Sequence, residues 1–284
     1  MNFVFISPNF PAAYDRFCLG LHENGVNVLG IGDAPYDSLS DTLKYSLTEY
    51  YRVDDMMNYD QMVRAMGHLT AHHGKIDWVE SNNEFWLELD AALRTDFNVV
   101  SGLKSDQIMR YRSKTAMKKY YEMAGVPTAR YSQVVDLDTA RKFIDEVGYP
   151  VIVKPDRGVG ALQTWRIENE EDLKMFFYMI PELPYVMEEY ITGVVETYDG
   201  VINSKGEVLF AASHVSTNSI MDMVNEGVPV YYHVNKQVAP DIEDAGKRVL
   251  KAFDVRSRFF HLEFFRLTKD KPASAKPATS SVLK

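Results

Sequence analysis

The sequence predicts an α/β protein: a parallel α/β unit comes first, an α+β unit follows, and a disordered tail ends the chain. Three observations predict this. Short apolar β runs alternate with helical stretches over the first hundred residues. Antiparallel strand signals then mix with helices, and from residue 271 the chain is rich in Pro, Ala, Ser, Thr and Lys. We expect domains at 1–104 and 105–270 and the tail at 271–284.

The first unit has the pattern strand, helix, strand, helix, strand. Apolar runs over 3–7, 26–31 and 76–81 predict the strands, and helical spacing predicts helices over 14–24 and 62–69. In parallel sheets, ligand-binding and catalytic residues usually lie just beyond the carboxyl ends of the strands. The residues in these places are Ser7 to Phe10, Gly32 to Ala34 and Ser81 to Glu84.

The second unit begins with two helices that have marked ends. They cover 113–125, with Ser113 as the expected N-cap and a stop at Gly125, and 137–148, with a stop at Gly148. A β-branched strand follows at 149–154, and β runs on either side of 204–206 predict a hairpin. Helices mixed with antiparallel strands predict an α+β unit.

Composition excludes several classes of partner. The 40 acidic residues outnumber the 31 basic ones, and the net charge of -9 would repel a nucleic-acid backbone. The single cysteine, Cys18, cannot form an intrachain disulfide, and no apolar run is long enough to span a bilayer or resembles a secretory signal. We therefore expect a cytoplasmic protein with no nucleic-acid or membrane partner; the sequence leaves open whether it forms a homodimer.

The strongest local signal for chemistry is YPVIVKPDRGVGA at 149–161. Its strand delivers Lys154 and turns into a loop that contains Gly158 and Gly160. A lysine at a strand end supplies positive charge, and glycines let backbone N–H groups approach phosphate oxygens. Neither a GxxxxGK[ST] nor a GxGxxG motif is present. Taken alone, the loop is equally well interpreted as a Gly-x-Gly hairpin turn.

Three further candidate binding features lie before and after this loop in the chain. They are Lys114, the pair Glu188 and Glu189 in PYVMEEYITG, and Glu263 in RFFHLEFFRL. Glu263 lies within an aromatic strand. If its carboxylate is buried, it needs a metal ion or a basic side chain as a partner, because an unpaired buried charge is costly. From the strand alone, a salt bridge to Arg258 or Arg266, or an outward-facing side chain, is the favoured interpretation.

In this order, Lys114, VIVKPDRGVGA, MEEYITG and FHLEFF resemble the ATP-grasp superfamily, over residues 105–267. The first unit is similar to the pre-ATP-grasp domain that usually precedes it. GVPTARY and SRFFHLEFFRL look most similar to carboxylate-amine ligases of the carbamoyl-phosphate-synthase-like group. The resemblance implies a small lid subdomain at about 125–190 and an incomplete C-terminal subdomain at about 191–270.

The resemblance implies that ATP lies between two α+β subdomains, with Mg²⁺. The implied nucleotide-binding residues are Lys114, Lys154, Asp156, Gly158, Gly160, Ala161, Glu188, Glu189, Ile191 and Glu196, and the implied magnesium ligand is Glu263. In the family, the lysines lie near the phosphates and the loop closes over them. The Glu188 side chain and the backbone of Glu189 and Ile191 would contact adenine, and Glu196 would contact the ribose.

The implied activity is an ATP-dependent ligase that joins a small-molecule carboxylate to an amine through an acyl phosphate, releasing ADP and phosphate. The family's chain usually continues to a second carboxylate, an asparagine and an arginine, whereas this sequence passes into the tail after Asp270. We therefore expect a truncated domain. The alternative is a catalytically impaired ATP- or ADP-binding module, and a third reading is a biotin-carboxylase-like or D-alanine-ligase-like enzyme.

Other clusters have plainer interpretations. His68, His72 and His73 at a helix end meet the helix dipole favourably and have no third metal ligand at a supporting spacing. Residues 80–84 predict a polar turn that caps the next helix, with a substrate contact as the alternative. The segment 219–233 is interpreted as core rather than as an acceptor pocket.

Overall fold

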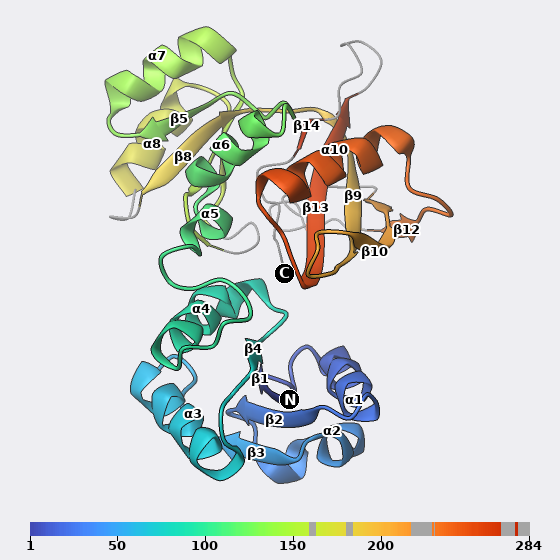
Figure 1. Ribbon diagram of the computed structural model, residues 1–284. Coiled ribbons are helices and arrows are strands. Elements are labelled where there is room, and N and C mark those ends of the chain that lie inside the picture. The colour runs from blue at the N-terminus through green and yellow to red at the C-terminus, as the bar shows by residue number, and fades with distance from the viewer. Residues whose placement is uncertain (159–162, 180–183, 217–228, 230, 268–275, 278–284) are drawn as a thin grey trace. The chain divides into compact units, whose positions relative to one another are not determined.

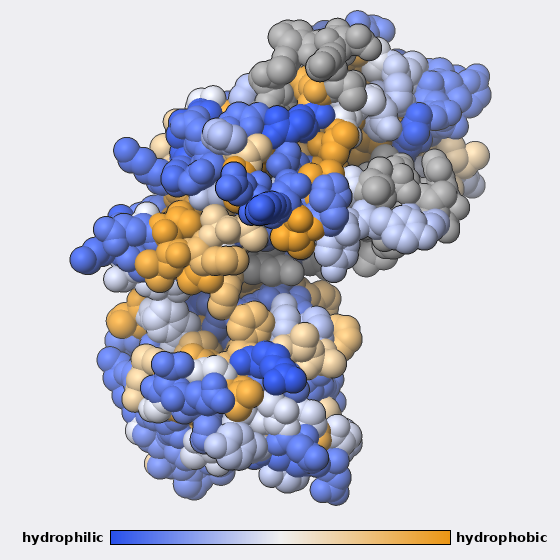
Figure 2. All heavy atoms as spheres, turned by 90° about the vertical axis from the view of Figure 1, so that its right-hand side faces the viewer, coloured by the Kyte–Doolittle hydropathy of each residue, from blue (hydrophilic) through white to orange (hydrophobic). Residues whose placement is uncertain are grey.

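The computed structural model describes residues 1–158, 163–179, 184–216, 229, 231–267 and 276–277 (Figure 1). The chain divides into two compact units, residues 1–108 and 109–284. The subdomain limits within the second unit stay predictions. No helix in the described part of the chain is long and apolar enough to cross a membrane. The face in Figure 2 is mostly hydrophilic, with smaller hydrophobic patches between the polar residues.

Unit 1 is a parallel sheet with helices on both faces (Figure 1). The strands pair in the order β3-β2-β1-β4, and every pairing is parallel. They are β1 (Asn2–Ile6), β2 (Asn27–Gly32), β3 (Glu49–Arg52) and β4 (Trp78–Glu80). The helices are α1 (Asp15–Glu23), α2 (Asp41–Ser46), α3 (Tyr59–His73) and α4 (Leu87–Asp96), with short 3₁₀ helices at Ala12–Tyr14, Tyr36–Ser38 and Glu84–Trp86. The predicted strands and helices are confirmed, α4 is the helix expected after the turn at 80–84, and β3 and α2 are additional.

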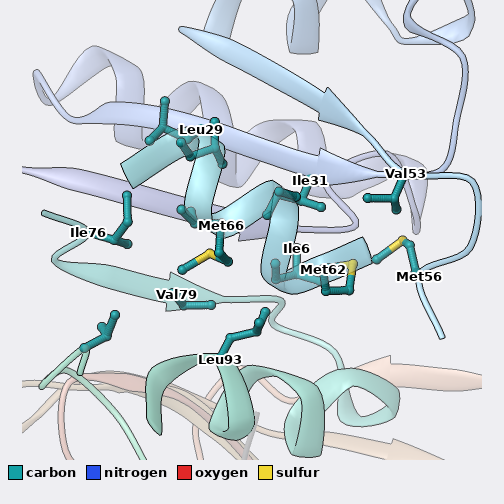
Figure 3. Packing of buried hydrophobic residues seen from close by; sticks show 14 residues of the cluster. Ile6, Leu29, Ile31, Val53, Met56, Met62, Met66, Ile76, Val79 and Leu93 are labelled. Atoms are coloured by element: carbon teal, nitrogen blue, oxygen red, sulfur yellow. The ribbon is translucent and has the colours of Figure 1, made fainter. Parts of the chain in front are cut away.

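One face of this sheet packs against α3 and α4. Met62 and Met66 of α3 and Leu93 of α4 point toward Ile6 and Ile31 of the sheet (Figure 3). All five side chains are completely buried. Burial on both faces explains why these strands appear in the sequence as continuous apolar runs rather than as alternating ones.

The other face packs against α1 and α2. Phe3 and Phe5 of β1 meet Cys18 of α1 and Leu43 of α2. Burial raises the pKa of the Cys18 thiol to about 12, so its reactive thiolate form is suppressed. Cys18 is the small buried hydrophobe that the sequence predicts.

A carboxylate ties the end of α3 to the edge of the sheet. Glu49 of β3 lies 2.5 Å from Nε2 of His68 and 2.6 Å from Nε2 of His73. The hydrogen bond with His73 has the largest effect, and together with His68 it lowers the pKa of Glu49 against the opposing effect of burial. These histidines therefore have a specific acidic partner as well as the helix-end position that the sequence indicates.

Because the pKa of Glu49 is lower in the folded state, its contribution to stability is present above its unfolded value, about 4.3, and is lost as pH falls through the folded value. Relative to Glu49→Gln, we expect the wild type to be more stable by up to about 1 kcal/mol at pH 5 and to lose this advantage toward pH 3. Urea unfolding across that range measures the difference. Glu23→Gln, at an exposed position on α1, is the control and should change the free energy of unfolding by less than about 0.5 kcal/mol.

Unit 2 contains two sheets and the helices that pack on them (Figure 1). In one sheet the order is β5-β8-β6-β7, with antiparallel pairings. In the other the order is β12-β11-β9-β13-β14, and β10 also pairs with β9. The strands are β5 (Tyr131–Val134), β6 (Val151–Pro155), β7 (Trp165–Ile167), β8 (Tyr185–Glu189), β9 (Gly193–Ile202), β10 (Val208–Ala212), β11 (His214–Ser216), β12 (Tyr232–Val234), β13 (Arg258–Leu267) and β14 (Lys276–Pro277). The helices are α5 (Met109–Arg112), α6 (Lys114–Met123), α7 (Leu137–Val147), α8 (Glu170–Met179) and α10 (Pro240–Ala252).

The local signals of the sequence form as predicted in this unit. The Ser113 side chain caps α6 by accepting a hydrogen bond from Ala116 N, and Gly148 ends α7. The hairpin is confirmed by the antiparallel pairing of Val208 with Ile202. Within the predicted tail the structure describes only Lys276–Pro277, which pairs with β13, and the rest of 271–284 lies outside the described residues.

The second sheet is held against α10 by a close approach that requires a glycine. A Cβ on Gly246 of α10 would lie 2.2 Å from Cδ1 of Tyr198, which is buried on β9. Phe260 lies beside the Tyr198 ring, with ring centroids 5.1 Å apart. This packing covers one face of β9 and β13, and the strand register places Thr197, Asp199, His261 and Glu263 on the opposite face.

Candidate nucleotide site

Two lysines lie where β6 passes into its loop. Lys154 is on β6, and Lys114 is the first residue of α6. Lys114 Nζ donates to the carbonyl oxygens of Pro155, at 2.9 Å, and Gly158, at 3.5 Å, and the Lys114 N–H donates to the carbonyl of Asp156. The start of α6 is therefore tied to the end of β6, with an ammonium group from each element.

Asp156 has a structural part in this arrangement. Its Oδ1 accepts from Thr115 N at 2.9 Å and from Thr115 Oγ1 at 2.7 Å. A carboxylate is favourable at the N-terminus of a helix, so Asp156 fixes the loop to α6. Gly158 has φ +135°, which only glycine adopts without strain. Gly160 and Ala161 lie outside the described residues, as does most of the segment 219–233.

The carboxylate of Glu188 lies between two lysines. Glu188 is 4% exposed, and its Oε2 lies 2.7 Å from Lys154 Nζ and its Oε1 2.9 Å from Lys118 Nζ. The sequence analysis missed Lys118. Its position four residues after Lys114 places both lysines on one face of α6, and that spacing was the available signal.

The Glu189 side chain is turned to Arg130. Its carboxylate accepts from Arg130 N at 2.9 Å and from Arg130 Nε at 2.8 Å, while Glu189 N donates to the Arg130 carbonyl. Ile191 is half-buried in the connection between β8 and β9. The side chain and the N–H of Glu189 are thus both engaged with Arg130, and a nucleotide contact through the Glu189 backbone stays a prediction.

Glu196 is already surrounded by protein donors. The side chain is buried, with Oε1 accepting from Ser213 Oγ and Asn235 Nδ2 and Oε2 accepting from Arg266 Nε at 2.8 Å. Arg266 also pairs with Asp241. A ribose hydroxyl would have to displace or share one of these donors, so the assignment of Glu196 to the ribose stays a prediction.

Glu263 belongs to a polar cluster on the face of the second sheet opposite α10. The register pairs Glu263 with Thr197 and His261 with Asp199, so the period of two places all four side chains on one face. His261 Nδ1 lies 2.5 Å from Asp199 Oδ1, and its Nε2 lies 3.5 Å from Glu263 Oε1. Burial opposes charge on His261, but the two carboxylates raise its pKa to about 9. His261 is thus one basic partner of Glu263, and Arg266 pairs with Glu196 and Asp241.

Among the residues that the structure describes, no group of three or more His, Cys, Asp or Glu side chains is arranged to hold a metal ion. Glu263 is a carboxylate that could contribute one ligand to a hard cation. Phosphate oxygens are suitable donors.

Known structures share this fold. An L-amino acid ligase from Bacillus licheniformis matches with a TM-score of 0.70 and 15% identity, over 97% of this chain and 65% of the ligase. The biotin carboxylase domain of Hydrogenobacter thermophilus 2-oxoglutarate carboxylase, in complex with MgADP, ADP and bicarbonate, matches with a TM-score of 0.71 and 17% identity, over 96% of this chain and 62% of that one. The predicted α/β fold class is confirmed.

The sequence relationship is more specific. The ATP-grasp domain model matches residues 119–273, which is more than half of the chain, and the chain therefore belongs to the ATP-grasp domain family. The L-arginine-specific L-amino acid ligase of Bacillus subtilis is 28% identical over 227 residues, covering 76% of this chain and 54% of the ligase. The chain thus spans about half the length of this curated relative. The family resemblance predicted from the sequence is confirmed.

Proposed function

We propose that unit 2 binds ATP with Mg²⁺ and that Lys114 and Lys154 contact its phosphates. The observation that carries the proposal is the arrangement of two ammonium groups at the β6 loop. Lys154 and the loop lie inside the region that matches the ATP-grasp family, and Lys114 lies just before it. Fixed positive charge and a glycine with free backbone geometry are what a triphosphate needs. The Glu188 side chain and the backbone of Glu189 and Ile191 would hold the adenine.

The proposed reaction joins a small-molecule carboxylate to an amine. The carboxylate oxygen attacks the γ-phosphorus of ATP and ADP leaves, giving an acyl phosphate. The amine then attacks the acyl carbon, phosphate leaves, and the nitrogen loses a proton. Lys114 and Lys154 would stabilise the charge that develops on the transferred phosphoryl group. The L-amino acid ligase relatives support this ligase class and favour amino acids as substrates.

Glu263 is the proposed protein ligand of Mg²⁺. Its side chain is 19% exposed, so it combines partial burial with access to a ligand. The residues fit an ion held mainly by phosphate oxygens, with one protein carboxylate. When bound, Mg²⁺ would neutralise phosphate charge during transfer.

For Glu263→Ala we expect the Kd for a non-hydrolysable ATP analogue to rise about tenfold in the presence of Mg²⁺ and to change little in EDTA, because one charged ligand is worth about 1.5 kcal/mol. Calorimetric titration measures both values. Glu207→Ala, an exposed carboxylate at the β9–β10 hairpin, is the control. Equal weakening with and without Mg²⁺ would count against a metal ligand at Glu263.

Turnover separates the ligase from a module that only binds nucleotide. The ligase requires ADP release that depends on both an amino acid donating its carboxylate and a second amino acid donating its amine. Pairs of amino acids should be screened for coupled ADP and phosphate release. Binding of the ATP analogue without turnover in any pair would favour the ATP- or ADP-binding module.

A further inference from the structure

We infer that Lys118 is a positioning residue for nucleotide binding: it keeps Glu188 neutralised, so that Lys154 is available to the phosphates. This inference rests on the proposed nucleotide site and adds a residue that does not itself touch the ligand. It concerns three charges that lie in contact within the described part of unit 2.

Lys118 is enclosed by protein. Its side chain is 0% exposed, and Nζ donates to the Ala129 carbonyl at 2.9 Å, meets Glu188 Oε1 at 2.9 Å, and lies 4.6 Å from the centre of the Tyr131 ring. Two oxygen acceptors and an aromatic face compensate the buried ammonium. A group with these partners and no exposure is not placed to contact a phosphate.

Lys154 is the accessible member of the trio. Its side chain is 14% exposed, against 5% for Glu188 and 0% for Lys118. The backbone partner of Lys154 on β8 is Val186, two residues before Glu188, so its ammonium reaches Glu188 diagonally across the strand pair. Of the two cations on Glu188, only Lys154 is therefore placed to move toward a ligand.

The proposed role of Lys118 is to compensate the negative charge of Glu188. When a phosphate draws Lys154 away, Glu188 keeps Lys118 as its counter-ion and is not left as an uncompensated buried charge, which would be strongly unfavourable. Without Lys118, Glu188 would have Lys154 as its main counter-ion and would hold it. The loss of a residue that never touches the nucleotide should then weaken phosphate binding.

The test compares four proteins: wild type, Lys118→Met, Glu188→Gln and the double variant. The Kd for an ATP analogue with Mg²⁺ should rise about tenfold in Lys118→Met, because Lys154 must leave an otherwise uncompensated carboxylate. In the double variant it should return to within about threefold of the Glu188→Gln value, since no buried carboxylate then retains Lys154. Lys119→Met, the adjacent exposed lysine of α6, is the matched control and should bind as the wild type does.

The outcomes are separable. Binding by the wild type with no change in Lys118→Met overturns the inference alone, and so does a double variant that binds more than about threefold more weakly than Glu188→Gln. No binding by the folded wild type overturns the nucleotide site and this inference with it. If Lys118→Met does not fold, the double variant decides: folding and binding like Glu188→Gln support the inference, and failure to fold overturns it.

Discussion

Lys154→Ala is expected to raise the Kd for an ATP analogue about 10- to 100-fold and to leave the protein folded. The loss corresponds to one or two hydrogen bonds from a charged donor to phosphate, each worth about 1.5–3 kcal/mol. The fold should tolerate the change because Lys154 is partly exposed and Lys118 remains paired with Glu188. Lys154→Ala should therefore bind the analogue more weakly while the free energy of unfolding changes little.

Calorimetry with the analogue, ADP and adenosine tests the assignment to phosphate. The loss should be largest for the triphosphate and nearly absent for adenosine, because Lys154 is proposed to contact phosphate and not the base. Lys174→Ala is the control, since Lys174 lies on α8 in the same unit and is 58% exposed. A uniform loss for all three ligands would instead place Lys154 at the adenine.

Sequence reasoning succeeded where the signal is local. Ser113 caps α6 and Gly148 ends α7 because capping depends on a few neighbouring residues. The chain order of Lys114, VIVKPDRGVGA, MEEYITG and FHLEFF was enough to predict the family. Each of these features is contained in one short segment or in the order of several.

The parts that were missed depend on contacts between distant segments. β3 has only four residues, Glu49–Arg52, of which none is fully buried, so it has little hydrophobic pattern to detect. The partnership of Asp199 with His261 depends on the register of β9 with β13, which joins residues far apart in the chain. A sequence read segment by segment contains the residues of such a pair but not their alignment.

In unit 1, the contacts of Arg94 are another example of contacts between distant segments that the sequence did not reveal. The sequence predicts a polar turn at 80–84, and the structure confirms that the Asn83 side chain caps the 3₁₀ helix Glu84–Trp86 by accepting from Phe85 N. Beneath this turn lies a buried charge cluster. Burial, followed by the nearby carboxylate of Glu80, raises the pKa of Asp90 to about 7, and Arg94 opposes that shift.

Arg94→Met is expected to destabilise unit 1 by about 3–5 kcal/mol, because removing one partner of a buried ion pair leaves uncompensated charge. Arg94 is 0% exposed and donates to Glu80 Oε2 at 3.0 Å and to the carbonyls of Val79 and Leu103. These bonds join α4, the end of β4 and the chain beyond α4. Urea unfolding followed by Trp78 and Trp86 fluorescence, in a Trp165→Phe background, reports on unit 1 alone.

The controls separate lost charge from lost packing. Arg64→Met removes an exposed arginine of α3 and should change stability by less than about 0.5 kcal/mol. Adding Glu80→Gln to Arg94→Met should recover part of the loss, since the carboxylate that depended on Arg94 is then neutral. If the double variant is no more stable than Arg94→Met, the hydrogen bonds to Val79 and Leu103 carry the stability, and the ion pair with Glu80 contributes little.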